Sequence, residues 1–364
     1  MEFTFQRGLH IINDTNGVLN NSNIIQTTDL WIGYKSGRSE IVVADQIDVA
    51  LQSGELVCLM GPNGSGKSTL IKTLAGMHAP LGGEVTLFGQ AMDALTIKQI
   101  ARKLSTVLTD RITIGNLDVF TLVSFGRSPY TGWLGQLRDE DEEKVRWAIE
   151  ATGLQPLARR DISTLSDGER QKVMIARALA QDTDLILLDE PTAHLDLPNR
   201  VEIIRLLRSL ARETGKGILL STHELDLALK AGDRAWLINK NRQLFTGVPE
   251  DLVLNGTFEA VFQRESFDFD RATGSFKLHQ TAGPTIVLSG NEVGKFWTRR
   301  ALEREGIRVS DSPQADFRID VTNDVNEFSW AFEFPNQNEQ DRSTRRKEFY
   351  SIEALIHAVR GEIK

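Results

Sequence analysis

The segment Gly61-Pro-Asn-Gly-Ser-Gly-Lys-Ser-Thr69 constrains the fold of this chain more than any other stretch. It fits the pattern G-x-x-x-x-G-K-[ST], in which glycines let backbone N–H groups surround a phosphate without a side chain in the way. The largely apolar residues 55–60 precede it as a short buried strand, and residues 68–75 follow it with no helix breaker until Gly76. A strand, a glycine loop and a helix in this order predict a nucleotide-binding loop.

The residues of this loop have distinct predicted roles. Lys67 would place a point charge near the β- and γ-phosphates, and the Ser68 hydroxyl would ligate Mg²⁺. The helix after the loop would present its free N–H groups and the positive end of its dipole to the same anion. The predicted nucleotide-contacting residues of the loop are Gly61, Pro62, Asn63, Gly64, Ser65, Gly66, Lys67, Ser68 and Thr69.

Charge and composition argue against several other classes of protein. The formal net charge of −8 argues against general nucleic-acid binding, which requires a basic surface. The single cysteine, Cys58, fits a reducing cytoplasm and excludes a disulfide framework. No apolar stretch approaches the roughly 20 residues of a membrane span, and the N-terminus lacks the layout of a signal peptide. We therefore expect any role at a membrane to be exercised from the cytoplasmic side, through a partner and without direct membrane insertion.

The chain is expected to consist of three regions. Residues 1–24 are rich in asparagine and carry little periodicity, so we expect a flexible tail. Residues 25–256 contain apolar strands that alternate with helices, which indicates a parallel sheet covered on both faces. Within them, residues 25–49 predict an antiparallel sheet, and residues from about 96 to 165 predict a mainly helical insert.

Residues 257–364 are expected to form a small α+β domain. They contain eleven of the seventeen phenylalanines, too many aromatic residues for a disordered tail. The expected elements are strands at 285–288, 317–321 and 328–334, helices at 292–305 and 351–360, and a loop at 336–346.

Two details of this C-terminal region carry further predictions. Val293, Phe296, Trp297 and Ala301 recur at helical spacing, so we expect them to be core residues rather than a cofactor site. The stretch Gly290-Asn-Glu-Val-Gly-Lys295 faintly resembles a phosphate loop, but it lacks the full glycine spacing and a hydroxyl residue after the lysine. We interpret it as an ordinary turn.

A pair of carboxylates follows the apolar run at residues 185–188. In a doubly wound sheet, ligands bind at the carboxyl ends of the strands, so Asp189 and Glu190 are expected to face the phosphate loop. Asp189 would hold Mg²⁺ through water, and Glu190 would orient and polarise the attacking water.

Further motifs occur in a specific order along the chain. Tyr34 precedes the phosphate loop, Leu165-Ser-Asp-Gly-Glu-Arg-Gln171 follows it, and Glu190-Pro-Thr-Ala-His-Leu-Asp196 and Ser221-Thr-His-Glu-Leu225 come next. With these motifs, residues 25–250 resemble the ATP-binding subunit of ABC transporters, whose signature is Leu-Ser-Gly-Gly-Gln. The resemblance implies a P-loop NTPase core of the α/β class, with an antiparallel β subdomain and a helical insert.

The resemblance also implies roles for residues outside the loop. Tyr34 stands where an aromatic ring stacks on adenine. Ser166 and Gly168 begin a helix that would bind the nucleotide of a second copy, so that a homodimer would enclose two ATP molecules. His223 would sense the γ-phosphate and hold Glu190 in line. The catalytic residues implied in this way are Lys67, Glu190 and His223.

The sequence departs from the family pattern at several positions. Asp167 and Glu169 replace a signature glycine and the signature glutamine, so they are expected to be paired or to point away from the phosphates. Thr109 stands at the Q-loop glutamine position, where its shorter side chain would reach Mg²⁺ weakly or through water. Ala193 and His194 replace the usual small pair of the D-loop. The expected nucleotide-binding residues beyond the loop are Tyr34, Ser166, Gly168 and Asp196, and the expected Mg²⁺ ligands are Ser68, Asp189 and Thr109.

Residues 123–130 and 132–135 resemble the corresponding part of importer ATPases for iron–siderophore, haem and vitamin B12. In this family the helical insert contacts a transmembrane permease, and exposed Tyr130 and Trp133 would form a cleft for it. Alternatively, the two rings fill the core of the insert. The six histidines are scattered, so no metal-ligand spacing for iron occurs in the chain.

The resemblance implies the ATP-hydrolysing subunit of a bacterial importer for an iron(III)–siderophore or related iron complex. Such a subunit would work as a homodimer at the cytoplasmic face of the inner membrane, with permease subunits and an upstream substrate-binding protein. The alternative function is that of a soluble ABC ATPase that drives assembly or repair without a permease.

Overall fold

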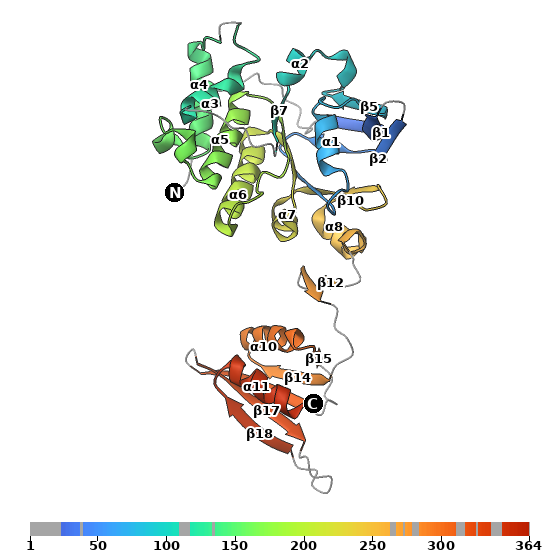
Figure 1. The fold of residues 1–364 in the computed structure, drawn as a ribbon, viewed down its shortest axis with the longest axis vertical. Helices are drawn as coiled ribbons and strands as arrows, with labels where there is room; N and C mark the ends of the chain where they lie inside the picture. Colours follow the sequence, from blue (N-terminus) through green and yellow to red (C-terminus); the bar gives the residue numbers. More distant parts are fainter. Residues whose placement is uncertain are drawn as a thin grey trace, which may run out of the picture. The chain divides into compact units, whose positions relative to one another are not determined.

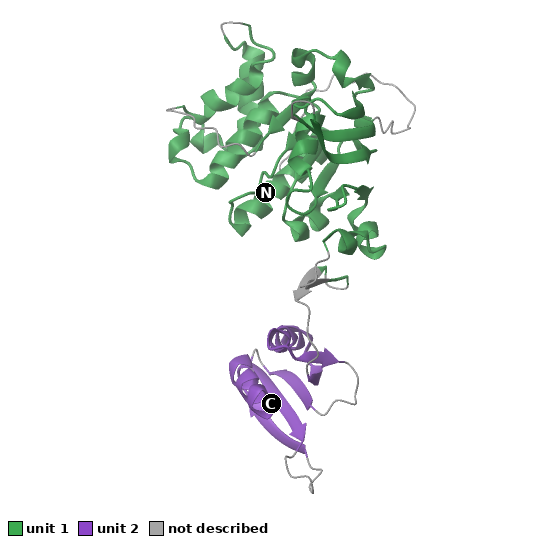
Figure 2. Ribbon diagram, turned by 45° about the vertical axis from the view of Figure 1, so that its right-hand side comes forward, with its two compact units in different colours: residues 1–263, 269–275 green, residues 264–268, 276–364 purple. Residues whose placement is uncertain are grey.

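The computed structural model describes residues 23–36, 39–108, 117–132, 135–262, 267–271, 274–278, 284–310, 317–324, 327–335 and 344–363. The chain divides into two compact units, which Figure 2 colours separately. The first unit contains residues 1–263 and 269–275, and the second contains residues 264–268 and 276–364.

A six-stranded sheet forms the centre of the first unit, with the strand order β11-β10-β4-β9-β8-β7. Five of its strands are parallel neighbours, which confirms the predicted parallel sheet. β11 adds an antiparallel edge that the sequence analysis did not predict. The strands are β4 (Leu56–Met60), β7 (Leu104–Val107), β8 (Leu185–Leu188), β9 (Gly217–Ser221), β10 (Arg234–Ile238) and β11 (Leu244–Gly247).

The helices of the first unit lie around this sheet, with α3, α4 and α5 gathered to one side in Figure 1. The insert helices α3 and α4 pack on α5. The helices are α1 (Lys67–Leu74), α2 (Ile97–Ala101), α3 (Val119–Ser124), α4 (Asp139–Ala151), α5 (Asp167–Ala180), α6 (Leu197–Thr214), α7 (Leu225–Ala231), α8 (Pro249–Leu254) and α9 (Thr257–Phe262).

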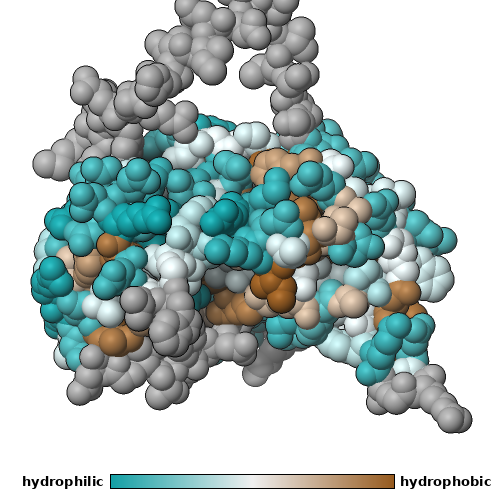
Figure 3. Space-filling model, turned by 90° about the horizontal axis from the view of Figure 1, so that it is seen from above, coloured by the Kyte–Doolittle hydropathy of each residue, from teal (hydrophilic) through white to brown (hydrophobic). Residues whose placement is uncertain are grey.

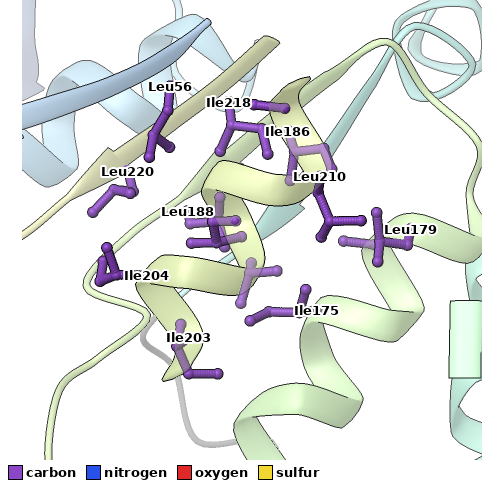
Figure 4. Close-up of a cluster of buried hydrophobic side chains, with 14 of the residues drawn as sticks. Leu56, Ile175, Leu179, Ile186, Leu188, Ile203, Ile204, Leu210, Ile218 and Leu220 are labelled. Carbon is purple, nitrogen blue, oxygen red and sulfur yellow. The ribbon is translucent and has the colours of Figure 1, made fainter. Parts of the chain in front are cut away.

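Alternate residues of the central strands enter two separate hydrophobic cores. Ile186 and Leu188 of β8 belong to the core that contains α5 and α6, and Figure 4 shows these side chains facing those of both helices. Leu185 and Leu187 belong to the core shared with α1 and the antiparallel sheet. Because successive strand residues point to opposite faces, this division explains why the strands are apolar throughout.

A separate antiparallel sheet carries the start of the described chain. Its strands run in the order β2-β1-β5-β6, and β3 also pairs with β1, which confirms the predicted antiparallel subdomain. The strands are β1 (Asn23–Ser36), β2 (Ser39–Ile47), β3 (Ala50–Gln52), β5 (Gly82–Leu87) and β6 (Gln90–Ala91).

The second unit contains a five-stranded sheet with the order β15-β14-β16-β17-β18. Helices α10 and α11 pack against its strands and against each other. β17 places Trp330, Phe332 and Phe334 in the core, with Phe328 partly buried against it, which confirms the strand expected at 328–334. The elements are β14 (Thr285–Gly290), α10 (Glu292–Arg304), β15 (Arg308–Ser310), β16 (Phe317–Asp324), β17 (Glu327–Pro335), β18 (Thr344–Phe349) and α11 (Ile352–Glu362), and the short pair β12 (Phe267–Asp270) and β13 (Ser275–Leu278) precedes them.

Two predictions for this unit are wrong. Residues 344–346 of the expected loop belong instead to β18, which begins at Thr344 and pairs with β17. Residues 336–343 lie outside the described residues. Val293, Phe296 and Trp297 were expected in the core, yet their side chains are exposed. α10 instead packs its small residues against the sheet: a Cβ on Gly294 would lie 2.4 Å from the Cγ1 atom of Val321.

Gly290 and its neighbours form the predicted turn. Gly290 has φ 98°, a left-handed value that favours glycine, and a Cβ there would lie 2.0 Å from the carbonyl oxygen of Val321. The side chain of Asn291 then caps α10 by accepting a hydrogen bond from the backbone N–H of Gly294. These contacts give both glycines a packing role.

The face of the molecule shown in Figure 3 is mainly hydrophilic, with hydrophobic residues in separate small spots. Among the described helices, none has both the length and the apolar character that a bilayer crossing requires.

Candidate nucleotide-binding site

The phosphate loop connects β4 to α1, and its glycines are required by its geometry. Gly66 immediately precedes α1 with φ 104°, and a Cβ on Gly61 would lie 2.4 Å from the carbonyl oxygen of Ile238. The hydroxyl of Ser65 is buried without a hydrogen-bond partner in the described part of the chain. The glycines therefore let the loop backbone come close to a ligand, and the Ser65 hydroxyl is available to donate a hydrogen bond to it. Both features suit a phosphate.

Lys67 lies inside this loop with 5 % of its surface exposed. Its Nζ donates hydrogen bonds to the carbonyl oxygens of Gly61 at 3.0 Å and Pro62 at 3.3 Å. Burial lowers the pKa of Lys67, and the charges of Glu190 and Asp189 oppose that change. The ammonium group is thus held between the loop and the acidic strand end.

Three elements meet at the carboxylate of Asp189. Ser68 Oγ, at the start of α1, donates to Asp189 Oδ1 at 3.1 Å, and Ser221 Oγ, at the end of β9, donates to the same oxygen at 2.7 Å. The backbone N–H of Glu190 donates to Ser221 Oγ at 2.9 Å. Ser221 is a contact that the sequence analysis missed. The hydroxyl and carboxylate oxygens of Ser68 and Asp189 are ligands that suit Mg²⁺.

Glu190 and His223 are in direct contact. His223 Nε2 lies 2.6 Å from Glu190 Oε1, and both side chains are partly exposed. Glu190 has φ 50°, in the left-handed region that residues other than glycine rarely adopt. Such backbone strain persists where the surrounding structure fixes a side chain for function. In this conformation, the Glu190 carboxylate, after the end of β8, contacts His223, which follows the end of β9.

Tyr34 links the antiparallel sheet to the phosphate loop. Its hydroxyl shares a hydrogen bond of 2.6 Å with Thr69 Oγ1, and 44 % of its surface is exposed. His78 packs edge-on against its ring with the centroids 5.5 Å apart. The sequence analysis missed His78, because no local pattern connects it with a residue of β1. An exposed ring fixed at two points offers a platform for a base.

The signature segment begins α5 with a capping box. Ser166 Oγ accepts from the backbone N–H of Glu169 at 3.3 Å, and both the backbone N–H and the hydroxyl of Ser166 donate to the Glu169 carboxylate at 2.8 Å. The two hydrogen bonds from Ser166 lower the pKa of Glu169, and the bond from the backbone N–H has the larger effect. Asp167 forms an ion pair with Arg170. Asp167 and Glu169 therefore both have partners, which confirms the expectation that these acidic residues are paired.

Gly168 and Asp196 meet through Asn199, another residue that the sequence analysis missed. A Cβ on Gly168 would lie 2.7 Å from Asn199 Oδ1. Asp196 Oδ1 accepts from the Asn199 backbone N–H at 3.1 Å and from its side-chain amide at 2.6 Å, and so caps α6. The side chain of Asp196 is therefore engaged in holding the start of α6.

Of the two aromatic residues predicted to be important in the insert, the structure describes Tyr130. Tyr130 is half-buried, with the Arg127 guanidinium 4.0 Å and the Arg102 guanidinium 5.3 Å from its ring centroid. Burial raises the pKa of its hydroxyl. Tyr130 thus packs between arginines of the insert and of the chain after α2. Trp133 and Thr109 lie outside the described residues.

Comparisons with known proteins match both units. The family model described as "ABC transporter" matches residues 44–193. A second model, described as "Iron ABC transporter C-terminal domain", matches residues 283–360.

Relatives and solved structures agree with these matches. The chain is 36 % identical over 241 residues to the iron(3+)-hydroxamate import ATP-binding protein FhuC of Bacillus subtilis, covering 66 % of this chain and 88 % of the relative. It is 34 % identical over 262 residues to the ferric enterobactin transport ATP-binding protein FepC of Escherichia coli, covering 72 % and 95 %.

Among solved structures, a dimeric ATP-binding cassette in a post-hydrolysis state with ADP and Pi gives a TM-score of 0.52 at 28 % identity, covering 59 % of this chain and 94 % of that one. A nucleotide-free ATP-binding cassette gives 0.59 at 22 % identity, covering 66 % and 98 %, and supports the fold alone. The chain therefore belongs to the ATP-binding proteins of ABC transporters, a family of ATPases.

Proposed function

We propose that this chain is the ATP-hydrolysing subunit of a bacterial importer for an iron(III)–siderophore or a related iron complex. The observation that carries the proposal is the convergence of Lys67, Ser68, Asp189, Glu190 and His223 at one edge of the central sheet. The substrate class is supported by what the relatives are named for and by the match of residues 283–360 to the iron transporter C-terminal model.

The residues of this edge divide the work of hydrolysis. Glu190 accepts a proton from a water molecule as its oxygen bonds to the γ-phosphorus and the bond to the β–γ bridging oxygen breaks. His223, 2.6 Å from Glu190, holds that carboxylate in position. Lys67 and the loop N–H groups stabilise the charge on the phosphates. Mg²⁺, held by Ser68 and Asp189, would neutralise further charge on the β- and γ-phosphate oxygens.

Two copies are proposed to act together. The start of α5, with Ser166 and Gly168, would close over the nucleotide that the phosphate loop of the second copy holds. Tyr34 of that second copy would stack on the adenine of the same nucleotide. ATP would then favour the closed dimer and hydrolysis would release it, because only the triphosphate contacts both copies. This alternation would be transmitted to permease subunits served by an upstream substrate-binding protein, with the ATPase at the cytoplasmic face of the inner membrane.

The substitution Glu190→Gln tests the catalytic assignment. Glutamine keeps the size of the side chain and a partner for His223 but cannot accept the proton, so turnover should fall by roughly 10²- to 10⁴-fold. The dissociation constant for ATP with Mg²⁺ should stay within about twofold, measured by equilibrium binding beside phosphate release. Unchanged turnover would show that another residue handles the water.

The same variant tests the transporter assignment. Tagged Glu190→Gln protein with ATP, expressed beside its chromosomal neighbours and purified in detergent, should retain a polytopic membrane protein. Cells that lack this partner should lose uptake of one radiolabelled ferric siderophore complex. Recovery of soluble partners alone, with the wild-type ATPase active, would favour the assembly or repair alternative.

A further inference from the structure

The hydroxyl of Ser221 is a buried polar group to which the proposed hydrolysis assigns no role. Ser221 is the last residue of β9 and is fully buried. Alternate residues of a strand point to the same face, so Ser221 shares the face of Leu219, which belongs to the core that contains residues of α1. The hydroxyl therefore lies on the side of the sheet where the phosphate loop passes into α1.

Strand register brings this hydroxyl to the two carboxylates. Leu188, the last residue of β8, pairs with Leu220 of β9. The next residue of each chain segment, Asp189 and Ser221, therefore leaves the sheet beside the other, and Glu190 follows at once. The contact is set by the pairing of two buried central strands rather than by the conformation of a loop.

The hydroxyl makes one hydrogen bond in each direction. A serine hydroxyl has a single hydrogen to donate and lone pairs with which to accept. Ser221 Oγ donates to Asp189 Oδ1 at 2.7 Å and accepts from the backbone N–H of Glu190 at 2.9 Å. A hydroxyl that donates to a carboxylate becomes a better acceptor, so the two bonds strengthen each other. Asp189 and the backbone of Glu190 are thus joined through one oxygen atom.

The end of β9 holds Glu190 at two points. Ser221 binds its backbone N–H, and His223, two residues later, lies 2.6 Å from its carboxylate. The backbone of Glu190 has φ 50°, a value that persists only where surrounding contacts maintain it. The bond to Ser221 is such a contact, because it fixes the peptide N–H of Glu190 itself.

We propose that Ser221 is a positioning residue for ATP hydrolysis, whose hydroxyl links Asp189 to the backbone of Glu190. A carboxylate fixed by Mg²⁺ fixes the hydroxyl bonded to it and, through that hydroxyl, the residue that receives the proton from water. The position of Glu190 then depends on whether Asp189 is engaged by the metal. The inference rests on the proposed function, since it takes Asp189 as a metal ligand and Glu190 as the proton acceptor.

Three substitutions of Ser221 separate hydrogen bonding from shape. Ser221→Ala removes both bonds and should lower turnover at saturating ATP and Mg²⁺ roughly tenfold, with the dissociation constant for ATP within about twofold of wild type. Ser221→Cys keeps the shape but bonds weakly, so it should lose about as much. Ser221→Thr keeps the hydroxyl and should stay within about threefold of wild type. Turnover of Ser221→Cys at the wild-type level would show that shape alone matters and would overturn the proposal.

Ser105→Ala is the matched control. Ser105 is a buried residue of β7, in the same sheet, and its hydroxyl accepts a hydrogen bond of 3.0 Å from Thr183 Oγ1 away from the phosphate loop. This variant should keep turnover within about twofold of wild type. Circular dichroism and melting temperature show whether each variant is folded. An equal loss of turnover in Ser105→Ala and Ser221→Ala would assign the effect to general destabilisation.

A double variant shows whether Ser221 acts through Glu190. With Glu190→Gln already present, no catalytic carboxylate remains to be positioned, so adding Ser221→Ala should lower the residual single-turnover rate by less than about twofold. The rate is measured with protein in excess over labelled ATP. A further tenfold loss would mean that Ser221 acts on another part of the site, and it would contradict the link to Glu190.

Nuclear magnetic resonance measures the link without turnover. In protein labelled with heavy-nitrogen glutamate, the amide resonance of Glu190 is the one that disappears in Glu190→Gln. Adding Mg²⁺ to the complex with a non-hydrolysable ATP analogue should shift this resonance in the wild type. In Ser221→Ala the change on adding Mg²⁺ should be about half as large or less. An equal change in the two proteins would overturn the coupling between Asp189 and Glu190.

The outcomes distinguish this inference from the proposed function. If Glu190→Gln nearly abolishes turnover while Ser221→Ala leaves both turnover and the Mg²⁺-dependent shift unchanged, the role of Ser221 fails and the catalytic assignment stands. If Glu190→Gln turns over like the wild type, the catalytic assignment itself fails, and the role of Ser221 fails with it.

Discussion

Two helices of the first unit begin at candidate phosphate-binding positions, but they are built differently. α1 follows Gly66 in a left-handed conformation and receives no side-chain cap, so its first N–H groups face the phosphate loop. α5 follows Ser166, and Glu169 closes a capping box on its end. The site at α1 is therefore assembled within one chain, whereas side chains of α5 itself satisfy the donors at its start.

The two helices also differ in how they are anchored. α1 follows the central strand β4 after the phosphate loop and is largely buried. α5 is fastened at its far end, where buried Arg127 donates to the carbonyl oxygen of Ala180 and to Asp141 Oδ1, at 2.9 Å each. Gln181 then donates to the carbonyl oxygens of Ala101 and Leu104. The insert therefore holds α5 at the end opposite the signature segment.

The largest effect is expected when this anchor is removed. Arg127→Met leaves the buried Asp141 carboxylate without its charged partner, which should cost about 3–5 kcal/mol in the free energy of unfolding. Denaturant unfolding of the first unit, followed by circular dichroism, measures it. Arg159→Met, which breaks an exposed ion pair with Asp118, is the matched control and should cost under about 1 kcal/mol. Equal losses would show that α5 is anchored elsewhere.

At α1 the expected loss is one of affinity rather than stability. Lys67→Ala removes the charge held inside the phosphate loop, and a charged hydrogen bond worth about 1.5–3 kcal/mol corresponds to roughly 10- to 150-fold weaker nucleotide binding. Isothermal titration with ATP and Mg²⁺ measures it. Lys72→Ala, at the other end of α1, should bind within about twofold of wild type. Intact binding by Lys67→Ala would overturn the phosphate-loop assignment.

The same contrast explains which parts of the molecule the sequence predicts. The phosphate loop, β4 and α1 are contiguous, so one local pattern specifies them together. The partners of Tyr34 and Gly168 are His78 and Asn199, which lie 44 and 31 residues away and join them only through the fold. Contacts of this kind leave no mark in local periodicity.

The errors in the second unit have a different physical cause. Helical periodicity identifies apolar faces, and α10 has two of them. The face with the larger apolar residues, Val293, Phe296 and Trp297, was predicted to be buried. The helix instead packs its other face on the sheet, because Gly294 lets α10 come closer to Val321 than a larger residue would allow. Packing distance against the sheet, rather than hydrophobicity, decided which face was covered. β11 and β18 were missed because an edge strand needs little apolar sequence.

A smaller, purely kinetic effect is expected at the signature segment. Gly168→Ala brings a methyl group to within 2.7 Å of Asn199 Oδ1, so Asn199 must move and the start of α5 shifts with it. Turnover at saturating ATP should fall about tenfold, while nucleotide affinity of the single chain stays within twofold. The double variant Gly168→Ala with Asn199→Ala removes the clash and should regain most of the turnover. No recovery would mean that Gly168 is needed for contact with the second copy itself.

The smallest effect is expected at Glu169. The test there is the direction in which its contribution to stability changes with pH. Hydrogen bonds from Ser166 lower the pKa of this carboxyl below that of the unfolded chain, so it stabilises the fold at pH values above the unfolded pKa. That contribution disappears as the pH falls through the folded pKa. Because the group is partly exposed, it should amount to no more than a few tenths of a kcal/mol.

Glu169→Gln keeps an acceptor for Ser166 but does not titrate. The difference in melting temperature between wild type and variant should therefore be present at neutral pH and shrink as the pH falls below about 4. At neutral pH the variant also removes a negative charge beside the phosphate proposed to come from the second copy, so the ATP-trapped dimer of Glu190→Gln should tighten, by about threefold or less. A weaker dimer would mean that Glu169 itself helps to hold the second copy, and that the two helix ends are less different than their caps indicate.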